Sequence, residues 1–282
     1  MLSSRTPSTR SWWATALLAA NSVAAAATTV GVTPHASYSS SIGVLGCKVN
    51  TNRIAYWPMA VDCNNICVSL SYGGRQVYLL RVDQSGGAHD VSYDAWNYLI
   101  TGKSATDDPT AGGSVDMQTE NVDASKCASL IHTSGSKLPL SAANSMNYLN
   151  SCLVQQAAGN TSWVAANYVL YNILDPICTY GFDETCSLTD WPDQNQATCP
   201  HQLGDPVALT TQPVYNIEYP TGEEVLAGAP AAAAPSTSAA TPNTNTNSAK
   251  ANQACSSMFQ SQSLLFWLLS MGAVVHAFLG SL

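Results

Sequence analysis

The sequence has little charge, and basic residues are its scarcest charged type. Only 10% of the 282 residues are charged, with 10 Lys and Arg against 18 Asp and Glu. Between residues 104 and 249, the only basic side chains are Lys126 and Lys137, against fourteen carboxylates. Such a surface repels phosphate backbones, so we expect no nucleic-acid binding. A sparsely charged acidic surface suits a neutral partner such as a polysaccharide, although solubility alone would also account for it.

Several motifs of catalytic and metal-binding proteins are also missing. The chain contains no Gly-x-Ser-x-Gly nucleophile elbow. Gly102-Lys103-Ser104 does not end a P-loop, because Asn97 occupies the position where that motif requires its first glycine. Cys63 and Cys67 are separated by three residues, but no second pair of metal ligands follows at the spacing of a zinc site. We therefore expect neither a cofactor nor a metal ion.

The apolar run at residues 264–279 lacks any Lys or Arg after it. An ordinary membrane-spanning helix has such a flanking positive charge on its cytoplasmic side. A mostly polar spacer at 256–263 and a cluster of small residues around Asn252 precede the run. This order is typical of a glycosylphosphatidylinositol (GPI) attachment signal, with Asn252 as the candidate attachment residue. The alternative is a tail-anchored or single-span protein.

The N-terminus has the features of a secretory signal peptide. Arg5 and Arg10 precede an apolar stretch at 12–20, and the small residues 23–27 offer a cleavage site. Together the two ends predict an extracellular protein, held by a GPI lipid in the outer leaflet of the cell membrane or incorporated in the cell wall.

The nine cysteines divide into eight and one, because Cys255 falls within the predicted tail signal. In an oxidising compartment we expect the other eight to form disulfides. The sequence does not choose among their possible pairings. The eight are Cys47, Cys63, Cys67, Cys127, Cys152, Cys178, Cys186 and Cys199.

The first half of the chain predicts strands around one short helix. Residues 66–72 alternate in polarity, and residues 76–82 are rich in β-forming side chains. The Gly73-Gly74 pair between them predicts a β-hairpin. Ser92 is expected to cap a short helix that Gly102 ends. Residues 113–122 predict a further strand.

After residue 122 the pattern predicts helices. Caps are expected at Asp123 or Ser125 and at Ser141, and a third helix is expected over 163–174. The sequon Asn160-Thr161-Ser162 predicts N-glycosylation at Asn160. Residues 229–249 consist only of Ala, Pro, Ser, Thr and Asn, a composition that predicts a flexible, O-glycosylated stalk.

Three segments carry a resemblance to a known fold. Residues 86–92 (GGAHDVS) with 95–99 (AWNYL) resemble the Gly-Gly-x-His-Phe-Asp-Leu-Ser segment and following helix of the double-psi β-barrel shared by barwin, the expansins, rare lipoprotein A and their endoglucanase relatives. The run 113–122, followed by Cys127, is similar to the strand that closes this barrel. Residues 53–57 (RIAYW), followed by Asp62-Cys63, are similar to the Tyr-Trp-Asp-Cys stretch of the endoglucanases.

This resemblance implies a fungal surface protein of the mainly β class, with a six-stranded, disulfide-stabilised barrel. The cysteine-rich helical segment that follows the barrel lies outside the resemblance and is expected from its own pattern. The predicted domains are the signal peptide (1–27), an N-terminal extension (28–40), the barrel (41–127), the helical extension (128–226), the stalk (227–252) and the GPI-attachment signal (253–282).

The resemblance also implies a possible chemistry, because hydrolytic relatives place two acids across a glycosidic bond. Asp90 matches the acid position, and Asp62 and Asp83 are the candidates for the second acid. Four residues separate Trp57 from Asp62, and the Phe between His and Asp is missing, so that His89 adjoins Asp90 directly. Both departures favour a non-catalytic protein, in which Asp90 has a structural role near the start of the helix.

Tyr56, Trp57 and His89 are the candidate glycan-binding residues. We expect the first two to be exposed and to stack on sugar rings, and His89 to form hydrogen bonds in the groove or act as a general acid or base. The function predicted first is non-catalytic binding or organisation of cell-wall polysaccharide. The alternatives are a glycan-cleaving enzyme, resembling an endoglucanase or lytic transglycosylase and using Asp90 as its acid, and a secreted effector that acts on host partners.

Overall fold

Two adjacent glycines form the turn of the hairpin at the centre of the fold. In the computed structural model, which describes residues 27–229, Gly73 and Gly74 have φ angles of 56° and 78°. Positive φ at both central residues is what a two-residue hairpin turn of type I′ requires. The flanking strands pair antiparallel from Cys67↔Leu80 to Tyr72↔Arg75, which confirms the predicted hairpin.

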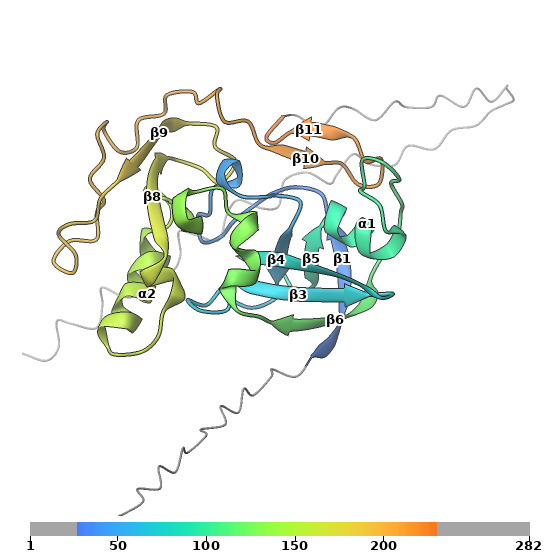
Figure 1. The fold of residues 1–282 in the computed structure, drawn as a ribbon. Coiled ribbons are helices and arrows are strands. Elements are labelled where there is room, and N and C mark those ends of the chain that lie inside the picture. Colours follow the sequence, from blue (N-terminus) through green and yellow to red (C-terminus); the bar gives the residue numbers. More distant parts are fainter. Residues whose placement is uncertain (1–26, 230–282) are drawn as a thin grey trace, which may run out of the picture. The chain divides into compact units, whose positions relative to one another are not determined.

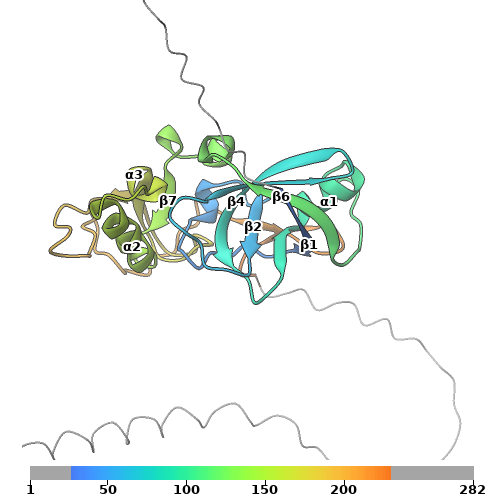
Figure 2. The same ribbon diagram turned by 90° about the horizontal axis from the view of Figure 1, so that it is seen from below.

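Six strands close into a barrel in the order β1-β5-β2-β4-β3-β6 (Figures 1 and 2). The pairs β1–β5 and β2–β4 are parallel, and the other four pairs are antiparallel. A closed barrel leaves no strand edge open to pairing with other chains. The mainly β class and the six-stranded barrel implied by the double-psi resemblance are confirmed. The strands are β1 (Thr28–His35), β2 (Ile54–Trp57), β3 (Cys67–Tyr72), β4 (Arg75–Gln84), β5 (His89–Ser92) and β6 (Val115–Asn121).

The barrel begins at Thr28 and not at residue 41. Residues 28–40 were expected to be an extension outside the barrel, but β1 lies between β5 and β6 and pairs with both. Without it the wall would have a gap, because β5 and β6 do not pair with each other. Gly31 and Pro34 weaken the strand pattern of this segment, and the cross-strand pairing overrides that weak propensity.

Helix α1 (Tyr93–Thr101) packs against the apolar interior of the barrel. Trp96 is fully buried and its indole Nε1–H donates to the Val32 carbonyl at 3.2 Å. The helix ends at Gly102, as expected, with a φ of 85°. Ser92 precedes the helix as expected, but its hydroxyl accepts a hydrogen bond from the Ile54 N–H and does not cap the helix.

The extension (residues 128–226) contains more β-structure than the sequence predicted. Only Trp163–Ala166 of the expected third helix is helical, and Tyr168–Ile173 forms a strand, because its β-branched and aromatic side chains pair with strands on both sides. Ser141 ends a strand and does not cap a helix. The elements are β7 (Leu138–Ser141), α2 (Met146–Ala157), α3 (Trp163–Ala166), β8 (Tyr168–Ile173), β9 (Gly181–Cys186), β10 (Tyr215–Ile217) and β11 (Glu224–Leu226).

Short 3₁₀ helices fill the remaining connections. One of them begins after Asp123, whose carboxylate accepts the Ser125 N–H at 2.9 Å and so provides the expected cap. The 3₁₀ helices are Gly46–Lys48, Ala124–Leu130 and Ser134–Ser136.

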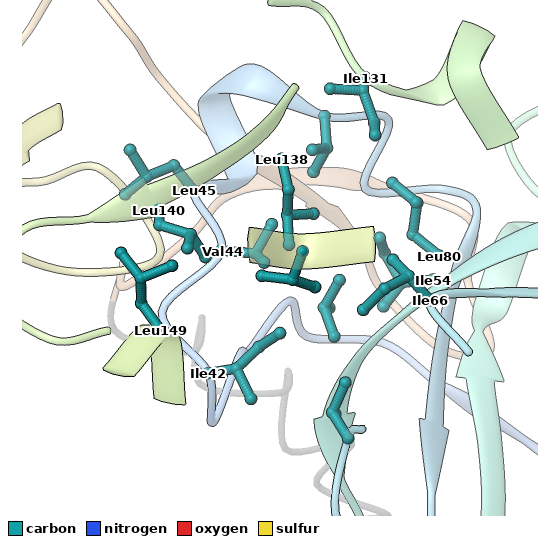
Figure 3. Packing of buried hydrophobic residues seen from close by; sticks show 14 of the residues in the cluster. Ile42, Val44, Leu45, Ile54, Ile66, Leu80, Ile131, Leu138, Leu140 and Leu149 are labelled. Carbon is teal, nitrogen blue, oxygen red and sulfur yellow. The ribbon is translucent and has the colours of Figure 1, made fainter. Parts of the chain in front are cut away.

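A second apolar core joins the outer wall of the barrel to the extension. Ile54 and Leu80 from the barrel pack into the same cluster as Leu138, Leu140 and Leu149 from the extension (Figure 3). All five side chains are fully buried. Burial of a side chain of this size contributes about 1.5–3 kcal/mol relative to its exposure. The extension is therefore part of the folded unit of the barrel.

The eight cysteines between residues 47 and 199 all form disulfides, as predicted. Cys67–Cys127 lies within the barrel region, Cys47–Cys178 and Cys63–Cys152 tie barrel loops to the extension, and Cys186–Cys199 closes a loop within the extension. Cross-links over long loops of this kind typically stabilise a protein by about 2–4 kcal/mol each.

Residues 1–26 and 230–282 lie outside the described part of the chain. The predicted signal peptide, nearly all of the stalk, Asn252, Cys255 and the GPI-attachment signal fall there. Among residues 27–229, no helix is both long and apolar enough to cross a membrane.

We predict that Asp94→Asn lowers the free energy of unfolding by about 3 kcal/mol, because it breaks a largely buried ion pair. Asp94 contacts the Arg53 guanidinium at 2.6 Å, and its side chain is 6% exposed. It also accepts hydrogen bonds from the Ser104 hydroxyl and the Ala105 N–H. Urea denaturation at neutral pH measures the loss. Asp108→Asn, which removes an exposed pair with Lys103, is the control and is expected to change stability by less than about 0.5 kcal/mol.

The same variant has a defined pH dependence. Burial alone would raise the pKa of the Asp94 carboxyl, but the hydrogen bonds from Ser104, Arg53 and Ala105 outweigh it and lower the pKa below 3.8. Stability from a carboxyl with a lowered pKa is complete above the unfolded-state value and is lost as the pH falls through the folded-state value. The difference between wild type and Asp94→Asn should therefore shrink below pH 3.8. A constant difference over that range would contradict this role.

Candidate functional site

Asp83, Tyr56 and Asp90 lie side by side on three neighbouring strands, and we call them the carboxylate row. Tyr56 of β2 is the register partner of Asp83 in β4 and of Asp90 in β5. Because neighbouring strands are about 4.8 Å apart, the Cα atoms of the two aspartates are about 10 Å apart, with Tyr56 between them. The fold thus brings together two of the three carboxylates predicted from the sequence.

A β-bulge turns Asp83 toward this row. The register between β2 and β4 steps from Ala55↔Arg81 to Tyr56↔Asp83 and so skips Val82. Strict alternation would place Asp83 on the same face as Arg81. Bulges commonly redirect a side chain in this way.

The Asp83 carboxylate is occupied by hydrogen bonds from the protein. Its Oδ2 accepts the Ser39 hydroxyl at 2.5 Å, and its Oδ1 accepts the N–H groups of Ser41 at 2.9 Å and Gln84 at 2.7 Å. Ser39 and Ser41 belong to the connection between β1 and β2. Asp83 therefore fastens this connection to the end of β4.

Asp90 lies within strand β5 and not at the start of the helix. Its carboxylate accepts the hydroxyl of Thr33, its register partner in β1. Among the described residues, Asp90 accepts no backbone N–H of helix α1, so the expected capping role is wrong. The half-buried Asp90 is instead a cross-strand partner in the barrel wall.

Asp62 closes a turn in the loop after β2. Its Oδ1 accepts the N–H groups of Asn64 and Asn65 at 2.7 and 2.6 Å, and its Oδ2 accepts the Asn65 side-chain amide at 2.9 Å. Burial alone would raise its pKa, but these hydrogen bonds, together with Arg81 at 3.8 Å, lower the pKa of the carboxyl. A carboxyl with a lowered pKa holds no proton at neutral pH, so Asp62 is unsuited to act as a general acid.

Tyr56 and Trp57 are buried, which corrects the expectation of an exposed stacking platform. They are only 3% and 5% exposed, because β2 is covered on both faces. The Tyr56 ring packs toward the extension, and its O–H donates to the Ser37 carbonyl at 3.3 Å. Burial, followed by the charges of Asp83 and Asp90, raises the pKa of the Tyr56 phenol well above its usual range, against the lowering effect of a hydrogen bond with the Ser39 backbone. Trp57 packs in the barrel interior.

His89 lies edge-on to Trp57, with 4.7 Å between ring centroids. Burial lowers the pKa of its imidazole, Asp90 opposes that shift, and Arg81 adds to it. His35 packs against Tyr56 at 4.6 Å between ring centroids and is a neighbour of the carboxylate row that the sequence did not indicate. Both His35 and Thr33 were missed because residues 28–40 were assigned to an extension outside the barrel.

Another part of the outer wall carries a shallow cleft. It consists of two neighbouring hollows of about 450 and about 400 Å³, and Gln76 is in the lining of both. We call this surface the Gln76 cleft. The larger hollow is lined by Ser71, Tyr72, Gly73, Gly74, Arg75, Gln76, Asp116 and Gln118. The smaller hollow is lined by Arg53, Gln76, Val77, Tyr78, Tyr98, Lys126, Ser129 and Leu130. No sequence motif indicated these residues, because they come from three strands and the hairpin turn, from a helix and a 3₁₀ segment, and from the position before β2.

The glycosylation sequon lies in a connection between α2 and α3. Asn160 is exposed, as a glycan acceptor must be. Its backbone N–H donates to the Gln155 carbonyl at 3.2 Å. Within residues 27–229, no three His, Cys, Asp or Glu side chains are grouped so as to hold a metal ion.

The barrel places the chain among small β-barrel proteins, and comparisons with known proteins add two similar structures. No family model and no curated protein matches the sequence. Cerato-platanin 3 from M. perniciosa is 15% identical, and cerato-platanin 2 from the same organism is 19% identical. Each alignment covers 36% of this chain and 98% of the other, with a TM-score of 0.27. The barrel itself is established by its own strand pairings.

We predict that Asp83→Ala destabilises the protein by about 2 kcal/mol, because it removes an ionised acceptor of three hydrogen bonds. Thermal unfolding followed by circular dichroism measures the change. Asp205 is exposed, and Asp205→Ala is the matched control, expected to be neutral. A melting temperature for Asp83→Ala equal to that of the control would contradict the fastening role of Asp83.

Proposed function

We propose that this chain is an extracellular surface protein that binds cell-wall polysaccharide without cleaving it. The main observation behind this proposal is that the candidate catalytic carboxylates already accept hydrogen bonds from other protein groups. Hydrolysis of a glycosidic bond requires one carboxyl that can donate a proton and a second that activates water or attacks the sugar. Asp62 instead accepts hydrogen bonds from its own loop, Asp83 accepts one from Ser39 in the connection between β1 and β2, and Asp90 accepts one from Thr33.

The space between the two aligned carboxylates also argues against cleavage. The buried Tyr56 lies between Asp83 and Asp90 in the register of the sheet. A glycosidic bond would have to occupy that position to be reached from both sides. The arrangement therefore supports a structural role for the carboxylate row.

The sequence signals and the cross-links support the proposed location. Four disulfides are typical of a chain that matures in an oxidising compartment. With the predicted signal peptide and tail signal, they support attachment by a GPI lipid to the outer leaflet or incorporation in the wall. The resemblance to fungal surface proteins with barwin-like barrels supports the same location.

We expect wild-type protein to bind at least one insoluble wall polysaccharide in a pull-down assay and to release no new reducing ends from it. Asp90→Asn should bind equally well, because it retains the shape of the side chain and part of its hydrogen bonding. Hydrolysis by wild type that falls about 10²–10⁴-fold in Asp90→Asn, at an unchanged melting temperature, would establish an enzyme instead.

Phosphatidylinositol-specific phospholipase C should release the protein from membranes of the producing cell, because that enzyme cleaves the GPI lipid by which the protein would be held. A protein truncated after residue 249 should be secreted into the medium without enzyme treatment. Retention on the membrane after treatment, with an intact C-terminal peptide detected by mass spectrometry, would refute the anchor.

A further inference from the structure

The polar side chains of the Gln76 cleft have unused hydrogen-bonding capacity, unlike those of the carboxylate row. Within the described residues, the side chains of Gln76, Gln118, Tyr72, Tyr78 and Tyr98 make no hydrogen bond to another protein group. Each remains exposed or half-buried on the outer wall. The cleft thus offers amide and phenol groups to a ligand, whereas the polar groups of the carboxylate row are already paired.

Strand register arranges these groups in rows. Gln76 and Gln118 are both register partners of Ser71, so their amides lie on either side of that small residue. In β3, Tyr72 follows Ser71 and lies at the hairpin turn, while Tyr78 of β4 pairs with Ser69. Three residues of β3 therefore separate the level of Tyr72 from the level of Tyr78, a distance of about 10 Å along the strand. By strand alternation Gln76, Gln118 and Tyr78 share the outer face, whereas Tyr72 lines the same hollow as the two amides from the end of the hairpin.

Two of the four charged side chains that line the cleft are engaged by other protein groups. Arg53 pairs with Asp94 at 2.6 Å, and the Arg75 guanidinium donates to carbonyls at the C-terminal end of α1. Asp116 and Lys126 remain, one in each hollow and of opposite sign. The hollow that contains both amides is thus lined by Arg75 and Asp116, whose opposite charges balance, and this suits a neutral ligand.

The residues that line the cleft also favour a glycan over a protein as the ligand. The centre of a protein interface is typically apolar and loses its water on binding. Here the aliphatic lining residues Val77 and Leu130 are buried or half-buried, and the most exposed apolar group is the Tyr72 ring, at 39%. A tyrosine ring presents an apolar face with a polar edge, as a pyranose ring does, so the two can stack while their hydroxyls remain bonded.

We propose that the Gln76 cleft binds a segment of a neutral polysaccharide, with Tyr72 and Tyr78 contacting the faces of sugar rings and the amides of Gln76 and Gln118 bonding their hydroxyls. This inference rests on the proposed function and gives it a site. The site differs from the carboxylate row to which the family resemblance pointed.

The test uses the intact secreted protein and four neutral probes, namely cellohexaose, chitohexaose, laminarihexaose and mannohexaose, with polygalacturonate as an acidic comparison. Titration calorimetry of wild type should show binding of at least one neutral probe and none of polygalacturonate. Tyr72→Ala and Gln76→Ala should each raise Kd about tenfold, and Tyr72→Phe should retain most of the affinity because the ring face remains.

Tyr180→Ala is the matched control, since Tyr180 is 46% exposed in the extension and lies outside the lining of the cleft. Its Kd should equal that of wild type, and the melting temperatures of all variants should agree. If Tyr72→Ala and Gln76→Ala bind as tightly as wild type, the assignment of the binding site to the Gln76 cleft is wrong, while the proposed function stands. No binding of any neutral probe or wall polysaccharide by wild type would overturn the proposed function, and the cleft with it. Preference for polygalacturonate would overturn the neutral-ligand assignment.

Discussion

Strand β2 is the element on which both cores depend, because it is buried on its two faces. Ala55 and Trp57 project into the barrel interior, and Ile54 and Tyr56 project into the core shared with the extension. A strand with one solvated face would show alternating polarity, whereas this one is apolar throughout. The extension is therefore required to cover a wall of the barrel that would otherwise expose a large apolar surface.

This double burial also determines what the carboxylate row is able to do. Covering β2 places the Tyr56 ring between Asp83 and Asp90 and draws the segment around Ser39 against the end of β4. The polar groups of the row are then bonded to neighbouring protein groups, Asp83 to Ser39 and Asp90 to Thr33, which leaves little for a ligand. Strands β4, β3 and β6 are neighbours in the barrel (Figure 1) and carry the Gln76 cleft, where the amides of Gln76 and Gln118 have no hydrogen-bond partner among the described residues.

The sequence correctly predicted those helices, strands and turns that depend on residues close together in the chain. The Gly73-Gly74 hairpin, the helix ended by Gly102 and the strand before Cys127 all follow from backbone preferences and alternation within a few residues. Predictions failed where a distant partner decides the conformation. Strand β1 contains Gly31 and Pro34 and forms because β5 and β6 pair with it. Residues 168–173 have a pattern compatible with a helix but lie between two strands.

The sequence by itself determined the barrel class, the set of paired cysteines and the residues that resemble a catalytic motif. Those properties depend on residue types and short spacings. Only the tertiary structure decided which cysteines pair, that Tyr56 and Trp57 are buried, and that Asp62 belongs to a turn. It also decided that Gln76, Gln118 and Tyr72 share one surface, because register between β3, β4 and β6 brings together residues more than forty positions apart. Burial and cross-strand register are properties of the closed barrel, and no single segment of the chain contains them.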